Sequence, residues 1–161
     1  MMNKKLVLLL AVTALIMTSC SVTKEVRGQR NLLSGTWSLS NISYENNTGT
    51  FSSLLFNDAK DICFKGSEWF FRDNNSTGRY TIPSGSLCSG GDRYIKWSVV
   101  TREGLSNQLQ FKAINAKNKD VSGGFGYRLD IVNLTPQAMT LKSDVSVNGS
   151  PVTVVYQFTK K

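Results

Sequence analysis

The chain has 161 residues, with 19 lysines and arginines against 11 aspartates and glutamates, a net charge of +8, and no histidine. Without histidine, Ser-His-Asp and Cys-His catalysis and His-ligated haem are excluded, and zinc loses its commonest ligand. The basic residues are scattered, and their densest group, residues 112–119, contains no aromatic residue that could stack on a base. We therefore expect no nucleic-acid partner, and a solvated basic surface suited to anionic lipid headgroups.

The first twenty residues have the pattern of an export signal. Two lysines are followed by an apolar run over residues 6–17 and by two small residues before Cys20. The run is shorter than the ~20 apolar residues that a transmembrane helix needs. Small residues directly before a cysteine resemble the lipobox of bacterial lipoproteins. This resemblance implies a signal peptide over residues 1–19, lipid attachment at Cys20 and a protein anchored in the cell envelope.

An ordinary secretory signal with a chance cysteine is the alternative for this leader. Ser21 stands where the inner-membrane retention signal of some lipoproteins carries Asp, and this likeness points to the outer membrane. Residues 20–31 are polar and aperiodic, so we predict a short lipidated tether there. Residues 32–161 are then one domain, long enough to bury its own core.

Two further cysteines, Cys63 and Cys88, remain if Cys20 carries lipid. An exported protein reaches a compartment where disulfides persist, and the remaining number is even. We predict one Cys63–Cys88 disulfide, with two buried free thiols as the alternative.

The pattern from residue 36 onward has a period of two. In residues 107–114, for example, Leu109, Phe111 and Ala113 alternate with glutamine and lysine, which is typical of a half-buried antiparallel strand. Turn residues separate such segments, and Asn148-Gly149 is a strong hairpin signal. We predict eight strands, at about 36–44, 67–72, 77–82, 93–101, 107–114, 125–134, 138–145 and 151–159.

One segment departs from the alternation. In the long connection over residues 45–66, Asn57 and Asp58 can cap a helix over 59–65 that Gly66 ends. The sequence thus predicts an all-β fold, an eight-stranded antiparallel up-and-down barrel with one short helix in its first long loop. A β-sandwich is the alternative.

Four short motifs lie in or beside the predicted strands: Gly35-Thr36-Trp37, Gly78-Arg79-Tyr80, Leu134-Thr135 before Met139-Thr140-Leu141, and the closing Val154-Val155-Tyr156-Gln157-Phe158. Together they resemble the lipocalin-like domains of bacterial lipoproteins, over about residues 32–160. The resemblance implies a small barrel with one end open to a ligand. The family's T-D-Y signature and its late Arg packed on the Trp are absent, and only Lys160 or Lys161 could replace that Arg.

The side chains that strand parity turns inward are all apolar or amphipathic: Trp37, Leu39, Trp69, Phe71, Tyr80, Ile82, Ile95, Trp97, Val99, Leu109, Phe111, Tyr127, Leu129, Ile131, Met139, Leu141, Val152, Val154, Tyr156 and Phe158. They either fill the barrel or line an apolar cavity, and both readings stay open. Trp37 is expected to close one end. The candidate ligand-binding residues are Trp69, Phe71, Trp97, Phe111, Tyr127 and Tyr156.

No catalytic motif, metal site or cofactor is expected. Asp58, Asp61 and Glu68 could form an acidic set, but helix capping and solvation account for them better. The function we expect is non-enzymatic: a membrane-tethered binding protein of the cell envelope for a small apolar or amphipathic molecule. The alternative is a solid barrel whose loops bind another envelope protein or inhibit a hydrolase. A cavity favours the first function, and an exposed apolar loop patch favours the second.

Overall fold

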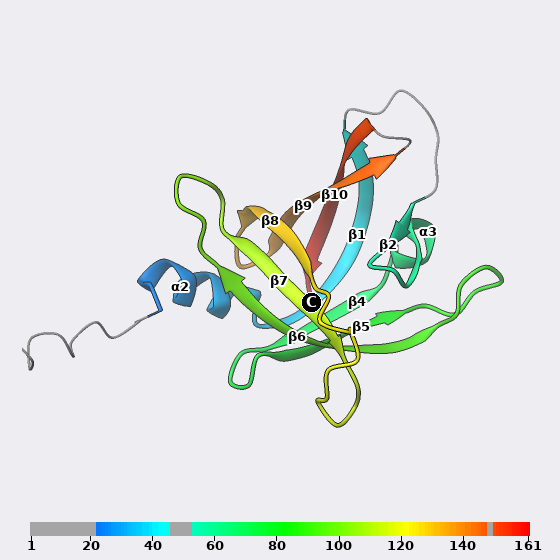
Figure 1. Cartoon of the computed structure of the whole chain (residues 1–161), viewed down its shortest axis with the longest axis horizontal. Helices are drawn as coiled ribbons and strands as arrows, with labels where there is room; N and C mark the ends of the chain where they lie inside the picture. Colours follow the sequence, from blue (N-terminus) through cyan, green and yellow to red (C-terminus); the bar gives the residue numbers. More distant parts are fainter. Residues whose placement is uncertain (1–21, 46–52, 148–149) are drawn as a thin grey trace, which may run out of the picture.

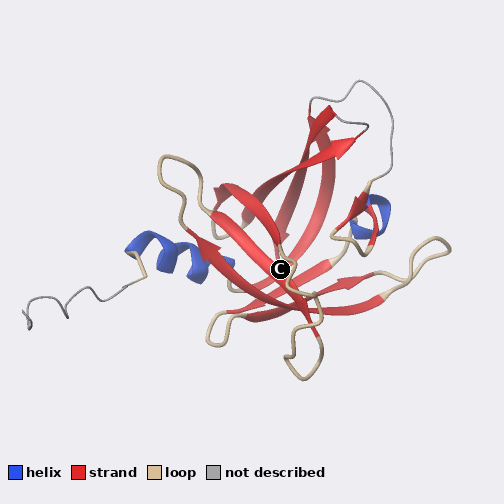
Figure 2. Cartoon of the chain, viewed as in Figure 1, coloured by secondary structure: helices blue, strands red, loops and turns tan. Residues whose placement is uncertain are grey.

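The computed structural model describes residues 22–45, 53–147 and 150–161. Within them, eight strands form a closed antiparallel barrel, paired in chain order and sealed where β1 contacts both β4 and β10 (Figures 1 and 2). The predicted up-and-down barrel is confirmed, and the sandwich is wrong. The barrel strands are β1 (Gly35–Glu45), β4 (Glu68–Arg72), β5 (Thr77–Ile82), β6 (Gly91–Val100), β7 (Gln108–Ile114), β8 (Tyr127–Leu134), β9 (Ala138–Val147) and β10 (Ser150–Lys160).

The alternation along the strands sets which side chains form the core. All of the predicted inward side chains are buried except Tyr127, which is partly buried at one end of the barrel. Alternation works because successive side chains of a strand point to opposite faces of the sheet. The Asn148-Gly149 turn lies outside the described residues, but β9 and β10 pair up to Val147 and Ser150 on either side of it.

The two ends of the barrel differ. The first, which we call the closed end, is covered by α2 (Lys24–Leu33). The second, which we call the open end, carries the two-stranded hairpin of β2 (Leu54–Leu55) and β3 (Ala59–Lys60), and the single helical turn α3 (Asp61–Phe64). Figure 1 shows α2 and the hairpin at opposite ends of the molecule. No helix among the described residues is long and apolar enough to cross a bilayer.

Helix α2 lies where the sequence predicts an aperiodic tether. Thr23 caps it by accepting a hydrogen bond from the Val26 amide at 3.2 Å, and Val26 and Leu33 are buried against the barrel. Arg30 adds hydrogen bonds to the turn between β4 and β5. The folded part therefore includes α2, which begins at Lys24, before the predicted boundary at residue 32. Val26, Arg30 and Leu33, spaced at i, i+4 and i+7, carry the helical signal that the polar composition obscures.

The closed end is also sealed by Trp37 and Lys160. Trp37 is fully buried, and its indole N–H donates to the Leu33 carbonyl at 2.7 Å. The Lys160 ammonium lies 4.3 Å from the centre of the Trp37 ring and donates to the Leu32 and Ser34 carbonyls. Lys160 is thus one of the two lysines that the resemblance leaves to replace the late Arg, and it lies on the Trp37 ring. Trp37 closes one end of the barrel, as expected.

The connection over residues 53–66 differs from the prediction in its helix. α3 has four residues, and Asn57 and Asp58 do not cap it but lie in the turn between β2 and β3. A helix of so few residues has little stability of its own, so tertiary contacts decide where it forms. Here the Asp58 carboxylate is bound by Arg93 instead of by helix amides. Gly66 does end the segment, with a positive φ of 81°.

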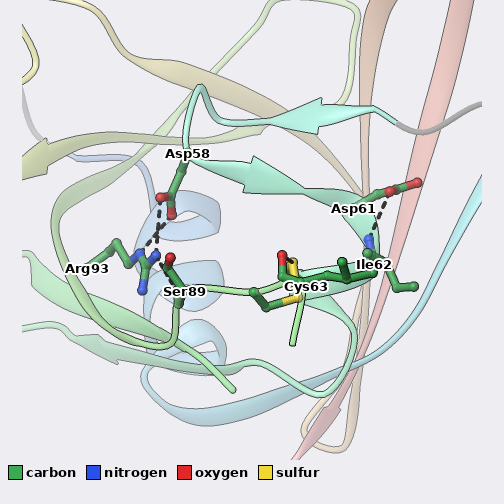
Figure 3. The surroundings of a disulfide bond; sticks show 8 residues. Asp58, Asp61, Ile62, Cys63, Ser89 and Arg93 are labelled. Carbon is green, nitrogen blue, oxygen red and sulfur yellow. Dashed lines mark hydrogen bonds and ion pairs between the residues drawn. A yellow bond between two sulfur atoms is a disulfide. The ribbon is translucent and has the colours of Figure 1, made fainter. Parts of the chain in front are cut away.

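The predicted disulfide is confirmed. Cys63 in α3 is bonded to Cys88 in the loop between β5 and β6, 25 residues further along the chain. Figure 3 shows the bond beside the Asp58–Arg93 ion pair. Both links tie the 53–66 segment to the rim of the barrel.

Candidate ligand site at the open end of the barrel

In the half of the barrel nearest the closed end, Trp97 and Phe71 make close contacts with their neighbours. The Trp97 indole N–H donates to the carbonyls of Arg72 and Thr77, and its ring lies 5.4 Å from that of Phe71. The Arg30 guanidinium, from α2, makes a cation–π contact with the Trp97 ring, 4.6 Å from the ring centre. Of the candidate ligand-binding residues, Phe71 and Trp97 therefore lie in this half, away from the open end.

The other four candidates converge on a residue that the sequence did not single out. Phe56, in the turn between β2 and β3, extends into the mouth of the barrel and meets six aromatic rings. The ring-centre distances from Phe56 are 5.1 Å to Phe111, 5.3 Å to Tyr127, 5.4 Å to Phe64, 5.7 Å to Tyr156, 5.8 Å to Trp69 and 6.5 Å to Tyr80. We call these seven rings the mouth cluster.

The turn that carries Phe56, residues 55–58, is strained. Phe56 and Asn57 have positive φ angles of 52° and 54°, a region that side chains other than glycine rarely adopt. Each such residue costs on the order of 1 kcal/mol, and the surroundings must supply that energy. Residues held in this way cluster at functional sites, which makes the turn a candidate for function.

Three side chains of the barrel hold the turn. The Tyr127 hydroxyl donates to the Phe56 carbonyl at 2.6 Å, and the Tyr80 hydroxyl donates to the Asp58 carboxylate at 2.9 Å. Arg93 pairs with the same carboxylate at 2.9 Å (Figure 3). Burial and the neighbouring Asp58 raise the pKa of Tyr80 well above its usual range, so this hydroxyl stays a donor at any physiological pH.

Two pockets open on either side of Phe56. One, of about 460 Å³, extends from Phe56 and Tyr80 to Ile95 and the loop between β7 and β8. The other, of about 450 Å³, lies between Leu54, Phe56 and Tyr156. Tyr127 and Phe125 border both, and Phe125 is 77% exposed. The mouth therefore has an aromatic floor and a rim where charged groups such as Arg93 and Arg128 reach solvent.

Asp58, Asp61 and Glu68 each contact different partners. Asp58 binds Tyr80 and Arg93, Asp61 accepts a hydrogen bond from Tyr44, and Glu68 pairs with Lys161 on the outer face. Lys161 holds the pKa of Glu68 below its usual value. Among the described residues, no group of three cysteine or acidic side chains could hold a metal ion.

Three members of the mouth cluster lie outside the predicted ligand-binding set. The alternation predicts that Tyr80 points inward, but Tyr80 is not among the predicted ligand-binding residues. Phe56 and Phe64 fall in the connection over residues 45–66, where the period-two pattern is absent. The one available signal for Phe56 is the apolar run Leu54-Leu55-Phe56 in a segment otherwise read as loop and helix. Parity cannot place such a residue, because it belongs to no barrel strand.

A closed eight-stranded up-and-down barrel defines a class of proteins whose interior is either filled by side chains or holds one small ligand. The sequence model described as a lipocalin-like domain matches residues 33–141. The chain therefore belongs to the lipocalin-like domain family, and its fold is consistent with binding a small hydrophobic molecule.

Two solved structures of animal proteins are similar to the chain. Lobster apocrustacyanin A1 has 14% sequence identity and a TM-score of 0.47, over 89% of this chain and 72% of that one. A complex of bovine odorant-binding protein with a selenium-containing odorant has 11% identity and a TM-score of 0.44, over 90% of this chain and 77% of that one. At these TM-scores the likeness carries no argument about function. No curated protein sequence matches the chain.

Proposed function

We propose that this protein is a lipid-anchored binding protein of the bacterial cell envelope that takes up a small apolar or amphipathic molecule at the open end of its barrel. The observation that carries the proposal is the pair of pockets in the mouth, floored by aromatic side chains and rimmed by polar ones. Such a site would bury an apolar body and leave a polar head at the rim. A charged group buried on the aromatic floor would be unpaired and costly.

The anchor would be Cys20, which lies outside the described residues. In the sequence, only Ser21 separates it from Val22, where the described chain begins. α2 follows directly and covers the closed end of the barrel. An anchor at Cys20 would therefore present the open end away from the membrane that holds it. Lipid attachment through Cys20, and the outer membrane as its location, are parts of this proposal.

Uptake of the neutral fluorescent compound N-phenylnaphthylamine tests the binding site. We expect wild-type protein to enhance its fluorescence saturably, and Phe125→Asp to weaken binding about tenfold, because a carboxylate at the mouth opposes entry of an apolar body. Leu105→Asp is the matched control, since Leu105 is also exposed but lies at the closed end. Absence of saturable uptake by folded wild-type protein, or equal effects of the two variants, contradicts the proposal.

Fractionation tests the anchor. We expect Cys20→Ser to release the protein from the membrane fraction at high salt, because two or more acyl chains hold a protein stably and a basic surface alone does not. A variant that still sediments with membranes at high salt contradicts anchoring through Cys20.

A second candidate function is docking to another envelope protein. Several large apolar side chains are exposed on the open end, and such patches mark interaction sites. They are Leu54, Ile62, Leu87, Val121 and Phe125. This function predicts that Ile62→Asp abolishes chemical crosslinking to an envelope protein, and that wild-type protein takes up no apolar compound.

A further inference from the structure

The Phe56 side chain sits in the mouth cluster as a bound ring would. Its ring meets Phe64, Trp69, Phe111 and Tyr127 edge to face, at interplanar angles of 81°, 73°, 70° and 70°. It stacks on Tyr156 at 25°. Edge-to-face and offset-stacked contacts are the arrangements that aromatic rings prefer, because the electron-rich face of one ring meets the positive edge of another. The surroundings of Phe56 therefore select a flat aromatic ring over an aliphatic body of similar size.

The segment that delivers this ring has little regular structure of its own and is held by point contacts. Among the described residues its hairpin has two paired positions, Leu54 with Lys60 and Leu55 with Ala59, and the Asp61 amide donates to the Ser53 carbonyl beside them. The turn carries two residues in the left-handed region. The hairpin pairs with no strand of the barrel. Short strained hairpins of this kind open at low cost compared with the barrel strands. Phe56 also stands between the two mouth pockets, so its withdrawal would join them into one site.

Withdrawal of the turn would also free hydrogen-bond donors beside the vacated place. The Tyr127 hydroxyl, which donates to the Phe56 carbonyl, and the Tyr80 hydroxyl, which donates to Asp58, would both lose their acceptors. A donor shielded from water without an acceptor is costly, and this applies most to the buried Tyr80, so an entering molecule gains by supplying an oxygen to it. Among the described residues the buried polar side chains are Ser67 and Asn107, and neither is charged, so a charge on the buried part of that molecule would be unpaired.

We propose that Phe56 is an internal occupant of the binding site, and that the ligand is an uncharged aromatic molecule with an oxygen acceptor whose ring replaces the Phe56 ring. This inference rests on the proposed function and narrows it to a ligand class. Because the place of the Phe56 ring is free only when Phe56 withdraws, the apparent affinity of the wild-type protein for such a ring is reduced in proportion to the fraction of molecules in which Phe56 has withdrawn. Removing the Phe56 ring removes that competition.

The test compares naphthol with decanol, which have the same number of non-hydrogen atoms and one hydroxyl each. Affinities are measured by displacement of N-phenylnaphthylamine, or by calorimetry with the full chain. We expect wild-type protein to bind naphthol at least about tenfold more tightly than decanol. We expect Phe56→Ala to bind naphthol about tenfold more tightly again, which corresponds to ~1.4 kcal/mol. Leu87→Ala, which removes an exposed rim side chain outside both pockets, should leave both affinities unchanged.

A folding check accompanies the variants, because Phe56 contributes to the core. Near-ultraviolet circular dichroism should show that each variant keeps ordered aromatic side chains. Phe56→Leu is the second variant: it keeps an apolar side chain in the mouth but no ring, and we expect a naphthol affinity between those of wild type and Phe56→Ala.

The outcomes separate the two proposals. Decanol binding as tight as naphthol binding in wild-type protein, or unchanged naphthol affinity in both folded Phe56 variants, overturns the assignment of Phe56 and leaves the proposed function standing. No binding of either compound, or of N-phenylnaphthylamine, by wild type or variants overturns the proposed function and this inference together.

Discussion

At the scale of single residues, Lys160 occupies the place on the Trp37 ring that the lipocalin resemblance assigns to an Arg. Lys160 covers the Trp37 ring and donates to two carbonyls at the junction between α2 and β1. Arg would offer a planar group with more donors, whereas Lys offers a compact charge on a flexible stem. Burial lowers the pKa of Lys160, but its contacts with the ring and the carbonyls are those of a cation.

Lys160→Met tests this role. The change keeps the apolar stem but removes the charge, so the Leu32 and Ser34 carbonyls lose a charged donor and the Trp37 ring loses its cation. We expect the free energy of unfolding in urea to fall by about 1–3 kcal/mol. Lys161→Met is the control: Lys161 forms an exposed ion pair with Glu68, and we expect a loss of about 0–1 kcal/mol. Equal losses in the two variants would contradict a special role for Lys160.

At the scale of elements, the two segments outside the barrel strands close its two ends by different means. α2 uses an amphipathic face and Arg30, which reaches the β4–β5 turn and the Trp97 ring. The 53–66 segment has little regular structure and depends on point contacts, namely the disulfide, the Asp58–Arg93 pair and the Phe56 ring. A segment held at points can open without unfolding the barrel, which suits the end where a ligand would enter.

Removing the disulfide tests how much it contributes. The bond closes a loop between residues 25 positions apart, and the chain-entropy argument gives about 3–4 kcal/mol of stabilisation for a loop of that size. We expect the double variant Cys63→Ala, Cys88→Ala to unfold at correspondingly lower urea concentration. Hydrogen exchange should increase first in residues 53–66 and only later in the barrel strands. Uniform exchange throughout the barrel would contradict local tethering.

At the scale of the whole molecule, the two halves of the barrel differ: α2 covers the closed end, and aromatic rings gather at the open end. Tyr44, Tyr80, Tyr127 and Tyr156 all lie towards the open end, and burial is the largest cause that raises the pKa of each. For Tyr156 burial raises the pKa to about 12 from 10.0. The open half therefore favours tyrosines in their neutral form and opposes their ionisation.

An alkaline titration of stability tests this distribution. Above pH ~10 the unfolded chain loses tyrosine protons that the folded chain retains, so stability present below that pH is lost as the pH rises towards the folded pKa values. Tyr156 alone should account for up to about 2–3 kcal/mol of loss between pH ~10 and ~12. We expect urea unfolding to show this decline, and Tyr156→Phe to flatten it. A decline of equal steepness in the variant would contradict the assignment to Tyr156.

The sequence alone determined the barrel and its core. Period-two alternation is a local property of each strand, so it assigns the inward side chains without knowledge of their partners. Two further features could be identified without the structure. One is the even number of cysteines beyond Cys20, and the other is the late lysine, Lys160 or Lys161, that the lipocalin resemblance places near Trp37. The disulfide and the Lys160–Trp37 contact confirm both.

Only the tertiary structure decided how the two ends are closed. α2 folds where the composition indicates a tether, because the barrel end buries Val26 and Leu33. Phe56 enters the mouth through a strained turn that contains no glycine, and aromatic packing and the Tyr127 and Asp58 contacts hold it there. Neither result follows from local pattern, because each depends on contacts with residues far away in the chain, and those contacts outweigh the local preferences of the segment.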